Sequence, residues 1–289
     1  MLVKIAVLTM TRARHDLLLA QVDGLSVGTQ PPHLHSVVSM GDRDLTRGRL
    51  PLGTDRWQTV VKPVPTDRRA LPIAAARNLA AHNAMEEGAD VLVFLDDRVI
   101  PGGRTLERLT EAVTGANVPD ELPDGPVLWR APLLGLPPVE DEAVGYPLRS
   151  LPELARQLPG VPPLVPGQFQ ADPRWPLFSG ACFAMSAEHF RATGGFCPDY
   201  IGHGLEDADF AEVVRRLGGG VVWVGGADAY LQPAEPVERD RQARYAVGHA
   251  QLWRERWGTE PDHPWITRLI AEGLLRREDD GTLVPATAR

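Results

Sequence analysis

The sequence of 289 residues contains only two cysteines, Cys182 and Cys197, and no long apolar run. Two cysteines do not make a disulfide framework, and neither lies in a metal-ligand spacing, so a reducing compartment is expected. No segment approaches the roughly 20 apolar residues that a membrane span needs. Residues 1–4 enter a predicted strand without a secretory leader. We therefore expect a cytoplasmic protein with no transmembrane segment.

Basic residues are also scarce. The sequence contains 30 Lys and Arg against 38 Asp and Glu, which gives a formal net charge of −8. Nucleic acids and acidic membranes bind basic surfaces, so this balance argues against either as a general partner. The hydrophobic content of 43% and charged content of 24% are those of an ordinary soluble globular protein. A local density of arginine could still serve a compact diphosphate, and it consists of Arg12, Arg14, Arg68, Arg69 and Arg77.

Two nucleotide-binding signatures are missing after the first predicted strand. Residues 9–14 read TMTRAR, whereas a dinucleotide-dependent oxidoreductase needs G-x-G-x-x-G there to bind the pyrophosphate. The Gly-rich, Lys-containing opening loop of nucleotidyltransferases is missing as well. Both absences argue against these two classes of enzyme.

Alternating strand and helix patterns predict an α/β protein with a mostly parallel sheet and right-handed crossovers. Strands are expected at residues 3–9, from 37, and at 58–61, 90–95, 178–185 and 221–224. Helices are expected at residues 15–27, 71–87, 104–114, 186–193, 206–217, 240–257 and 265–276.

Residues 116–177 differ in composition, because Pro recurs every few positions and the periodicity is poor. A long irregular segment in a compact domain is usually a lid or a linker. Its aromatic residues argue against disorder, so we expect a Pro-rich insertion or lid; an irregular connection packed on the sheet is the alternative. The segment separates residues 1–115 from residues 178–277, and residues 278–289 are expected to form a frayed polar tail.

Two pairs of acids carry the functional signal. The apolar run 91–95 ends in Asp96-Asp97, and a buried parallel strand delivers such carboxylates to the sheet edge where ligands bind. Further along the chain, Glu206-Asp207 follow the Gly-rich loop Gly202-His203-Gly204. Either pair alone fits a solvated strand end or a helix N-terminus. Together, and in this order, they fit a site that handles a nucleotide sugar.

These segments resemble the GT-A glycosyltransferases of family 2, with a second half similar to the galactosyltransferase-type GxGxED segment. The likeness is carried by residues 4–12 (KIAVLTMTR), 75–80 (AARNLA), 94–101 (FLDDRVIP), 178–180 (FSG) and 194–207 (GGFCPDYIGHGLED). The resemblance implies a Rossmann-like, mostly parallel mixed sheet flanked by helices, with further helices at the C-terminus. It also implies that residues 1–115 bind the nucleotide sugar and that residues 178–277 form the acceptor side of the same domain.

The resemblance to inverting members implies an enzyme that transfers a hexose or N-acetylhexosamine from a nucleotide sugar to a hydroxyl group. A UDP-sugar is the expected donor, and the sequence does not identify the acceptor. Asp207 would be the general base, because a carboxylate within reach of the hydroxyl can accept its proton, and Glu206 would orient donor or acceptor. The loop around the transferred sugar would contain Gly180, Gly202, His203 and Gly204, although glycines also favour plain turns.

The resemblance further implies donor-binding roles for Thr9, Arg12, Asp42, Arg77, Asn78, Asp96, Asp97 and Arg98. Thr9 and Arg12 would lie near the base or ribose, and Asp42 would pair with the imide N–H of uracil. Arg77 would reach a phosphate, and Asn78 would fix the neighbouring loop. A solvated helical arginine is the alternative for Arg77.

The chain departs from this family at the metal site. Members usually show Asp-x-Asp, whereas Arg98 occupies the second acidic position here, and Leu231 stands about where a ligand His is common. Asp97 would then be the principal ligand of a Mn²⁺ or Mg²⁺ ion that is weakly held or dispensable, because hard cations need several oxygens. Arg98 could offset diphosphate charge directly; a surface ion pair with Asp96 or Glu107 is the alternative.

These departures leave a second hypothesis open, in which a GT-A domain has lost turnover and acts as a binding or partner subunit. The missing metal ligands favour this hypothesis. The intact Glu206-Asp207 pair behind its Gly-rich loop favours an active transferase.

Overall fold

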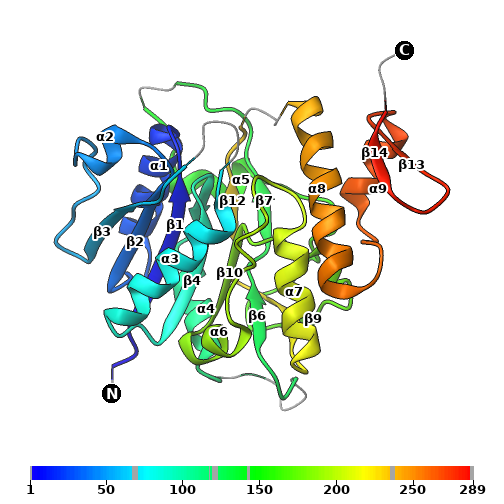
Figure 1. The fold of residues 1–289 in the computed structure, drawn as a ribbon. Coiled ribbons are helices and arrows are strands. Elements are labelled where there is room, and N and C mark those ends of the chain that lie inside the picture. Colours follow the sequence, from blue (N-terminus) through cyan, green and yellow to red (C-terminus); the bar gives the residue numbers. More distant parts are fainter. Residues whose placement is uncertain are drawn as a thin grey trace.

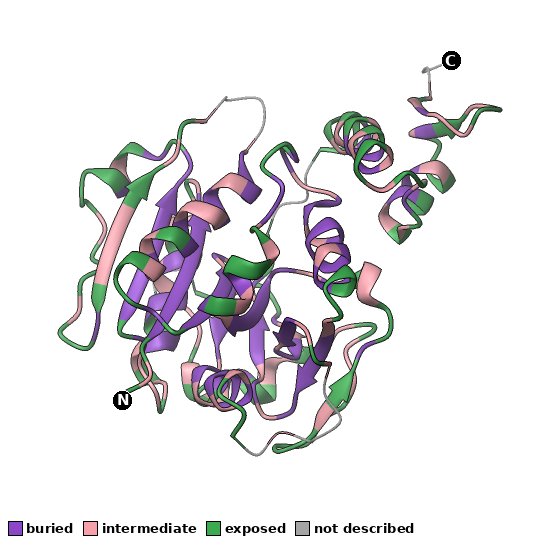
Figure 2. Ribbon diagram, turned by 60° about the horizontal axis from the view of Figure 1, so that its bottom comes forward, coloured by how far each residue is buried: buried purple, intermediate pink, exposed green. Residues whose placement is uncertain are grey.

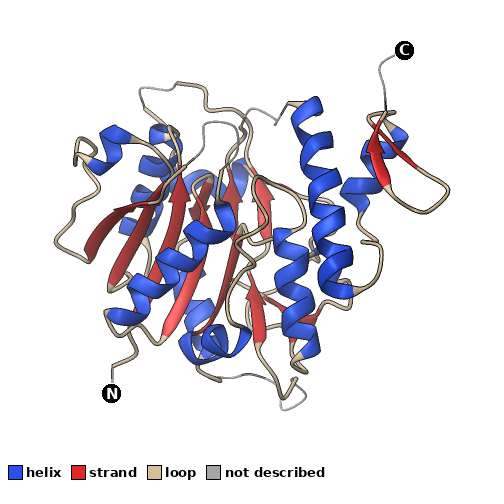
Figure 3. Cartoon of the chain, viewed as in Figure 1, coloured by secondary structure: helices blue, strands red, loops and turns tan. Residues whose placement is uncertain are grey.

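The computed structural model describes residues 2–66, 71–116, 118, 123–141, 144–234 and 238–286, so Arg68 and Arg69 lie outside the described residues. Its centre is an eight-stranded sheet flanked by helices (Figure 3). In spatial order the strands are β3 (Gln58–Pro63), β2 (Leu34–Ser39), β1 (Ile5–Thr11), β4 (Val91–Asp96), β10 (Cys182–Ser186), β6 (Val127–Arg130), β11 (Gly220–Val224) and β9 (Phe169–Ala171).

The four strands β3, β2, β1 and β4 run parallel to one another. β10 runs antiparallel to both of its neighbours, β4 and β6, and β9 is antiparallel to β11 at the edge. The predicted mixed α/β sheet is therefore confirmed. The parallel half carries the ends of β1 and β4 to the same edge of the sheet, as expected for a ligand site.

Helices cover both faces of the sheet, and its strands are the most buried part of the molecule (Figures 1 and 2). α1 (His15–Val27) and α4 (Thr105–Val113) pack on one face. α3 (Ile73–Glu86), α6 (Ala187–Thr193) and α7 (Glu206–Arg216) pack on the other. Every residue of β1 is buried, which explains why this strand forms a continuous apolar run in the sequence.

Residues 116–177 differ from the expected lid where the structure describes them, because β6 lies inside the main sheet between β10 and β11. A four-residue strand is too short to show a clear period in the sequence. A second, small sheet has the order β5 (Val99–Pro101), β12 (Ala229–Leu231), β7 (Leu133–Gly135), β8 (Arg156–Gln157). The remaining short helices are α2 (Arg43–Thr46), α5 (Leu151–Leu154) and the 3₁₀ turns η1 (Leu148–Ser150) and η2 (Trp175–Leu177).

The C-terminal part lies beside α7, away from the main sheet (Figure 1), and contains α8 (Arg239–Trp257) and α9 (Pro264–Ala271). The predictions of a helix to residue 276 and of a frayed tail from 278 are wrong for the described residues. Gly273 has a φ of 69°, which ends the helix, and β13 (Leu275–Arg277) pairs with β14 (Leu283–Pro285). This hairpin buries Leu275 and Leu283.

Candidate active site

A cavity of about 380 Å³ lies at the carboxyl ends of β1 and β4, beside the loop that leads into α7. Its charged and polar lining consists of Arg12, Arg14, Arg77, Asp96, Asp97, Arg98, Ser179, His203, Glu206, Asp207 and Gln242. The rest of its lining consists of Met10, Met40, Leu71, Ile73, Ala181, Gly204 and Trp265. The structure thus brings the two acid pairs from distant parts of the chain to one cavity, of a size suited to a small ligand.

The end of β1 lies two residues later than the sequence indicates. Thr9 is fully buried; its hydroxyl donates to Gln21 Oε1 at 2.7 Å and lies 3.1 Å from His35 Nε2. Thr9 therefore does not line the cavity, contrary to the expected donor contact. Thr11 ends the strand instead, and its hydroxyl donates to Asp97 Oδ2 at 2.7 Å.

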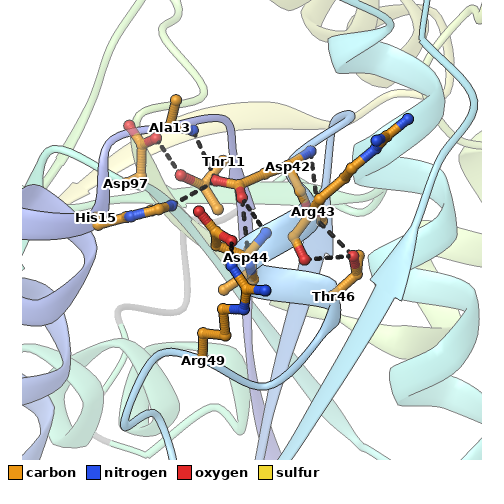
Figure 4. A network of polar contacts seen from close by, with 11 residues as sticks. Thr11, Ala13, His15, Asp42, Arg43, Asp44, Thr46, Arg49 and Asp97 are labelled. Atoms are coloured by element: carbon orange, nitrogen blue, oxygen red, sulfur yellow. Dashed lines mark hydrogen bonds and ion pairs between the residues drawn. The ribbon is translucent and has the colours of Figure 1, made fainter.

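Asp42 is the N-cap of α2, and both of its oxygens are bonded (Figure 4). Oδ1 accepts the backbone N–H groups of Asp44 and Leu45, at 3.0 and 3.1 Å. Oδ2 accepts the N–H of Ala13 at 3.0 Å and lies 2.6 Å from His15 Nε2. Burial opposes ionisation, but these contacts outweigh it and lower the pKa of Asp42. Asp42 organises the turn after β1 and does not line the cavity, so the expected contact with a nucleobase lacks a free oxygen.

Asp97 and Asp96 each hold an arginine at the end of β4. Asp97 Oδ1 lies 3.0 Å from Arg14 Nη1, and its other oxygen is bonded to Thr11. Asp96 Oδ1 accepts the backbone N–H of Arg98 at 3.1 Å and its Nε at 2.9 Å. Burial, and then the charge of Asp96, raise the pKa of Asp97 to about 6. Arg98 therefore pairs with Asp96 and also lines the cavity.

These carboxylates alone offer few oxygens to a divalent cation. Both oxygens of Asp97 are bonded, and Asp96 has a single oxygen, Oδ2, without a hydrogen bond from the described residues. Within the described part of the chain, no group of three or more His, Cys, Asp or Glu could hold a metal ion. Leu231 pairs with Val99 in the small sheet and brings no ligand. A cation bound to Asp96 or Asp97 would therefore need most of its oxygens from the donor diphosphate and from water.

Arg77 of α3 and Asp207 of α7 form an ion pair across the cavity wall. The Arg77 side chain is only 6% exposed and lies 4.8 Å from the centre of the Phe196 ring, so it is not a solvated helical arginine. Asp207 also accepts the Gly180 N–H at 2.8 Å. A Cβ on Gly180 would lie 2.7 Å from Arg77 Nη2 and from Asp207 Oδ1, so only glycine leaves room for the pair.

Asn78 holds the loop at residues 194–196. Its Nδ2 donates to the Phe196 carbonyl at 2.8 Å, and its Oδ1 accepts the Phe196 N–H at 2.9 Å. Asn78 does not line the cavity, so the structure gives it this positioning contact and no contact with a donor.

His249 of α8 supports the Gly-rich loop from behind and has no counterpart in the sequence motifs. Its Nδ1 accepts the Leu205 N–H at 3.3 Å, and its Nε2 donates to the Ile201 carbonyl at 3.0 Å. Burial lowers the pKa of His249 to about 4, which keeps the ring neutral. Gly204 packs directly on it, because a Cβ there would lie 2.5 Å from His249 Nδ1 and from Trp265 Cζ3.

We expect Gly204→Ala to lower the free energy of unfolding by about 2 kcal/mol, because the added methyl group overpacks two buried rings. Chemical denaturation measures this change. Gly248→Ala in α8 is the matched control, since nothing lies within 4 Å of a Cβ at that position. Equal stability of the two variants would contradict the close packing of the loop on His249.

Residues 167–231 match a family described as the N-terminal domain of galactosyltransferase. No curated protein sequence is significantly similar to the chain. The solved structures that are similar to it include the following three. TarS 1-349 of S. aureus with UDP-GlcNAc is 12% identical, with a TM-score of 0.56, over 85% of this chain and 66% of TarS 1-349. GalNAc-T7 with UDP, GalNAc and Mn²⁺ is 14% identical, with a TM-score of 0.57, over 88% of this chain and 50% of GalNAc-T7. The mannosyltransferase PcManGT of Pyrobaculum calidifontis with GDP-Man and Mn²⁺ is 17% identical, with a TM-score of 0.53, over 93% of this chain and 68% of PcManGT.

The chain has the GT-A glycosyltransferase fold that these structures share. It spans about half to two thirds of the length of the TarS and GalNAc-T7 chains. The matched family segment contains Gly180 and the Glu206–Asp207 pair. No helix in the described ranges is both long and apolar enough to cross a membrane.

Proposed function

We propose that this protein is a nucleotide-sugar-dependent glycosyltransferase that moves a hexosyl or N-acetylhexosaminyl group, with inversion, to a hydroxyl of its acceptor. One observation carries the proposal: a single cavity joins several arginines with the carboxylates of Glu206 and Asp207. Arginines suit a diphosphate, and a carboxylate suits the removal of a hydroxyl proton. The GT-A fold, seen with UDP-GlcNAc in TarS, supports this assignment.

The donor diphosphate would lie at the arginine end of the cavity. Arg12 has no ion pair or hydrogen bond to its side chain among the described residues, so its charge is available to a ligand. The side chains of Arg14 and Arg98 are 34% and 31% exposed. Negative charge grows on the diphosphate as its bond to the sugar breaks, and fixed guanidinium groups stabilise that charge. Met10 and Met40 form an apolar part of the cavity wall, against which the nucleobase of the donor could pack.

The transfer forms one bond and breaks one. The acceptor oxygen attacks the anomeric carbon of the sugar, and the electron pair of the broken bond leaves with the nucleoside diphosphate. The acceptor proton passes to a carboxylate of the Glu206–Asp207 pair. Holding both substrates in one cavity makes the step effectively intramolecular.

We expect a UDP-sugar to raise the melting temperature, because a ligand that binds only the folded state stabilises it. The measurement is a thermal-shift comparison of UDP-, GDP- and dTDP-sugars, each with EDTA or Mn²⁺, followed by an assay of released nucleoside diphosphate. Binding without release, over a panel of hydroxyl-bearing acceptors, would favour the second candidate, an inactive GT-A subunit, which the poor metal donor set also favours. The absence of a shift with every nucleotide sugar would contradict both.

A further inference from the structure

The C-terminal helices supply one side of the cavity. Gln242 of α8 and Trp265 of α9 line it together with the Glu206–Asp207 pair, although both lie outside the matched family segment, residues 167–231. Trp265 packs against the loop directly before this pair, because a Cβ on Gly204 would lie 2.5 Å from the Cζ3 atom of the indole. The indole therefore lies beside the carboxylates that would receive the acceptor hydroxyl.

Trp265 is held in one orientation. Its backbone N–H donates to Nδ1 of His263, the N-cap of α9, at 3.2 Å, and its Nε1 donates to Gln242 Oε1 at 3.3 Å. The centre of its ring lies 6.2 Å from that of the buried His249. Pro264 at the first position of the helix fixes the backbone further. An aromatic side chain that is already fixed binds a ligand with little loss of conformational entropy.

The lining beside the Gly-rich loop is uncharged. Leu71 lies there, because its carbonyl accepts the Gly202 N–H at 2.8 Å, and burial lowers the pKa of His203, which keeps that ring neutral. An anionic acceptor would be repelled by the Glu206–Asp207 carboxylates, and Arg77 next to them is already paired with Asp207. This side of the cavity therefore favours a neutral, polar acceptor group.

A pyranose ring fits such a surface. One face of the ring carries C–H groups that pack on an indole, and its hydroxyls lie around the edge. Gln242 and Ser179 line the same cavity and have side chains that can exchange hydrogen bonds with those hydroxyls. The cavity of about 380 Å³ must also hold the donor, so the room beside Trp265 suits a small ring better than a lipid chain.

We propose that the acceptor is a carbohydrate with an uncharged sugar at its reacting end, and that Trp265 binds this sugar through the face of its indole. The assignment rests on the proposed function, because it names the acceptor class of that reaction. Trp265 takes no proton. The sugar hydroxyl oxygen bonds to the anomeric carbon of the donor, the diphosphate leaves, and the hydroxyl proton passes to a carboxylate of the Glu206–Asp207 pair.

Saturation-transfer difference NMR on the protein with UDP tests acceptor binding without turnover. The probes are the methyl glycosides of glucose, galactose, mannose and N-acetylglucosamine, together with glycerol 3-phosphate and an uncharged peptide that contains Ser and Thr. Ring protons of a methyl glycoside should receive saturation from the unmodified protein, and Trp265→Ala should lose this signal. Trp257→Ala is the matched control and should keep it. Trp257 is also half-buried and its Nε1 donates to Asp209 Oδ1 at 2.8 Å, but it lines a different cavity.

In the transfer assay, Trp265→Ala should raise the KM of the sugar acceptor about tenfold, the scale of one lost ring contact. Its kcat and its slow transfer to water should stay unchanged, because the ring binds the acceptor equally in the ground and transition states. Trp265→Phe keeps an aromatic face and should recover part of the affinity, and it serves as the test variant if Trp265→Ala does not show the UDP-induced thermal shift of a folded protein.

Three results would overturn the inference. They are an unchanged KM in the Trp265 variants, an equal loss in Trp257→Ala, or binding and transfer with the peptide or glycerol 3-phosphate and with none of the sugars. A protein that binds no nucleotide sugar would remove the proposed function and this inference with it, and the thermal shift detects that case separately.

Discussion

Arg77→Met will destabilise the protein by about 3 kcal/mol, the lower end of the range for a broken buried ion pair. Arg77 is almost fully buried, whereas the Asp207 side chain is 20% exposed, so water offsets part of the loss. The variant removes the Arg77 guanidinium between α3 and α7, so the neighbouring carboxylates of Glu206 and Asp207 lose their positively charged partner. Urea denaturation, followed by far-UV circular dichroism, measures the change in the free energy of unfolding.

The double variant Arg77→Met/Asp207→Asn should recover most of that stability, because neither member of the pair then remains as an unpaired charge. Arg104→Met is the matched control. Arg104 is 53% exposed in its pair with Glu107, and an exposed pair contributes about 0.5 kcal/mol. Arg77→Met and Arg104→Met with equal stabilities, or a double variant no more stable than Arg77→Met, would show that the Arg77–Asp207 pair does not hold the site together.

The parts of the site that follow local patterns could be predicted from the sequence. The apolar run of β4 places Asp96 and Asp97 at the sheet edge, and the Gly-rich loop places Glu206 and Asp207 at the start of α7. α1 has the predicted bounds, His15–Val27, because its apolar spacing and the prolines after it are local signals. Such signals depend on residues within one or two turns of each other.

The contacts that decide roles could not be predicted, because they join distant segments. Arg77 and Asp207 are 130 residues apart in sequence. Asp42 resembled a base-binding acid, but its neighbours make it a helix cap, a role that aspartate also fills well. His249 carries no motif, and its importance comes from the loop that packs on it. Tertiary packing thus decides between roles that the residue types allow equally.

EDTA will reduce turnover of the unmodified protein less than about tenfold, because guanidinium groups can stabilise a leaving diphosphate in place of a cation. Arg14 and Arg98 hold the two carboxylates of the β4 end, and Arg12 adds a charge without a partner among the described residues. A free dication would meet this positive surface and few available oxygens. Calorimetric titration with UDP should therefore give similar affinities in EDTA and in Mn²⁺.

Arg98→Ala should lower kcat in EDTA by about 10²-fold, as for a lost electrostatic donor, and Mn²⁺ should restore part of the loss. The variant frees Asp96 Oδ1 from the Arg98 side chain, so the site gains an oxygen for a cation while it loses a positive charge. Arg104→Ala, outside the cavity, is the control and should leave both the rate and its metal dependence unchanged. Loss of UDP binding and of turnover in EDTA by the unmodified protein, with no effect of Arg98→Ala, would instead make Arg98 a bystander. The arginine would then be only the ion-pair partner of Asp96, and a cation would carry the diphosphate charge.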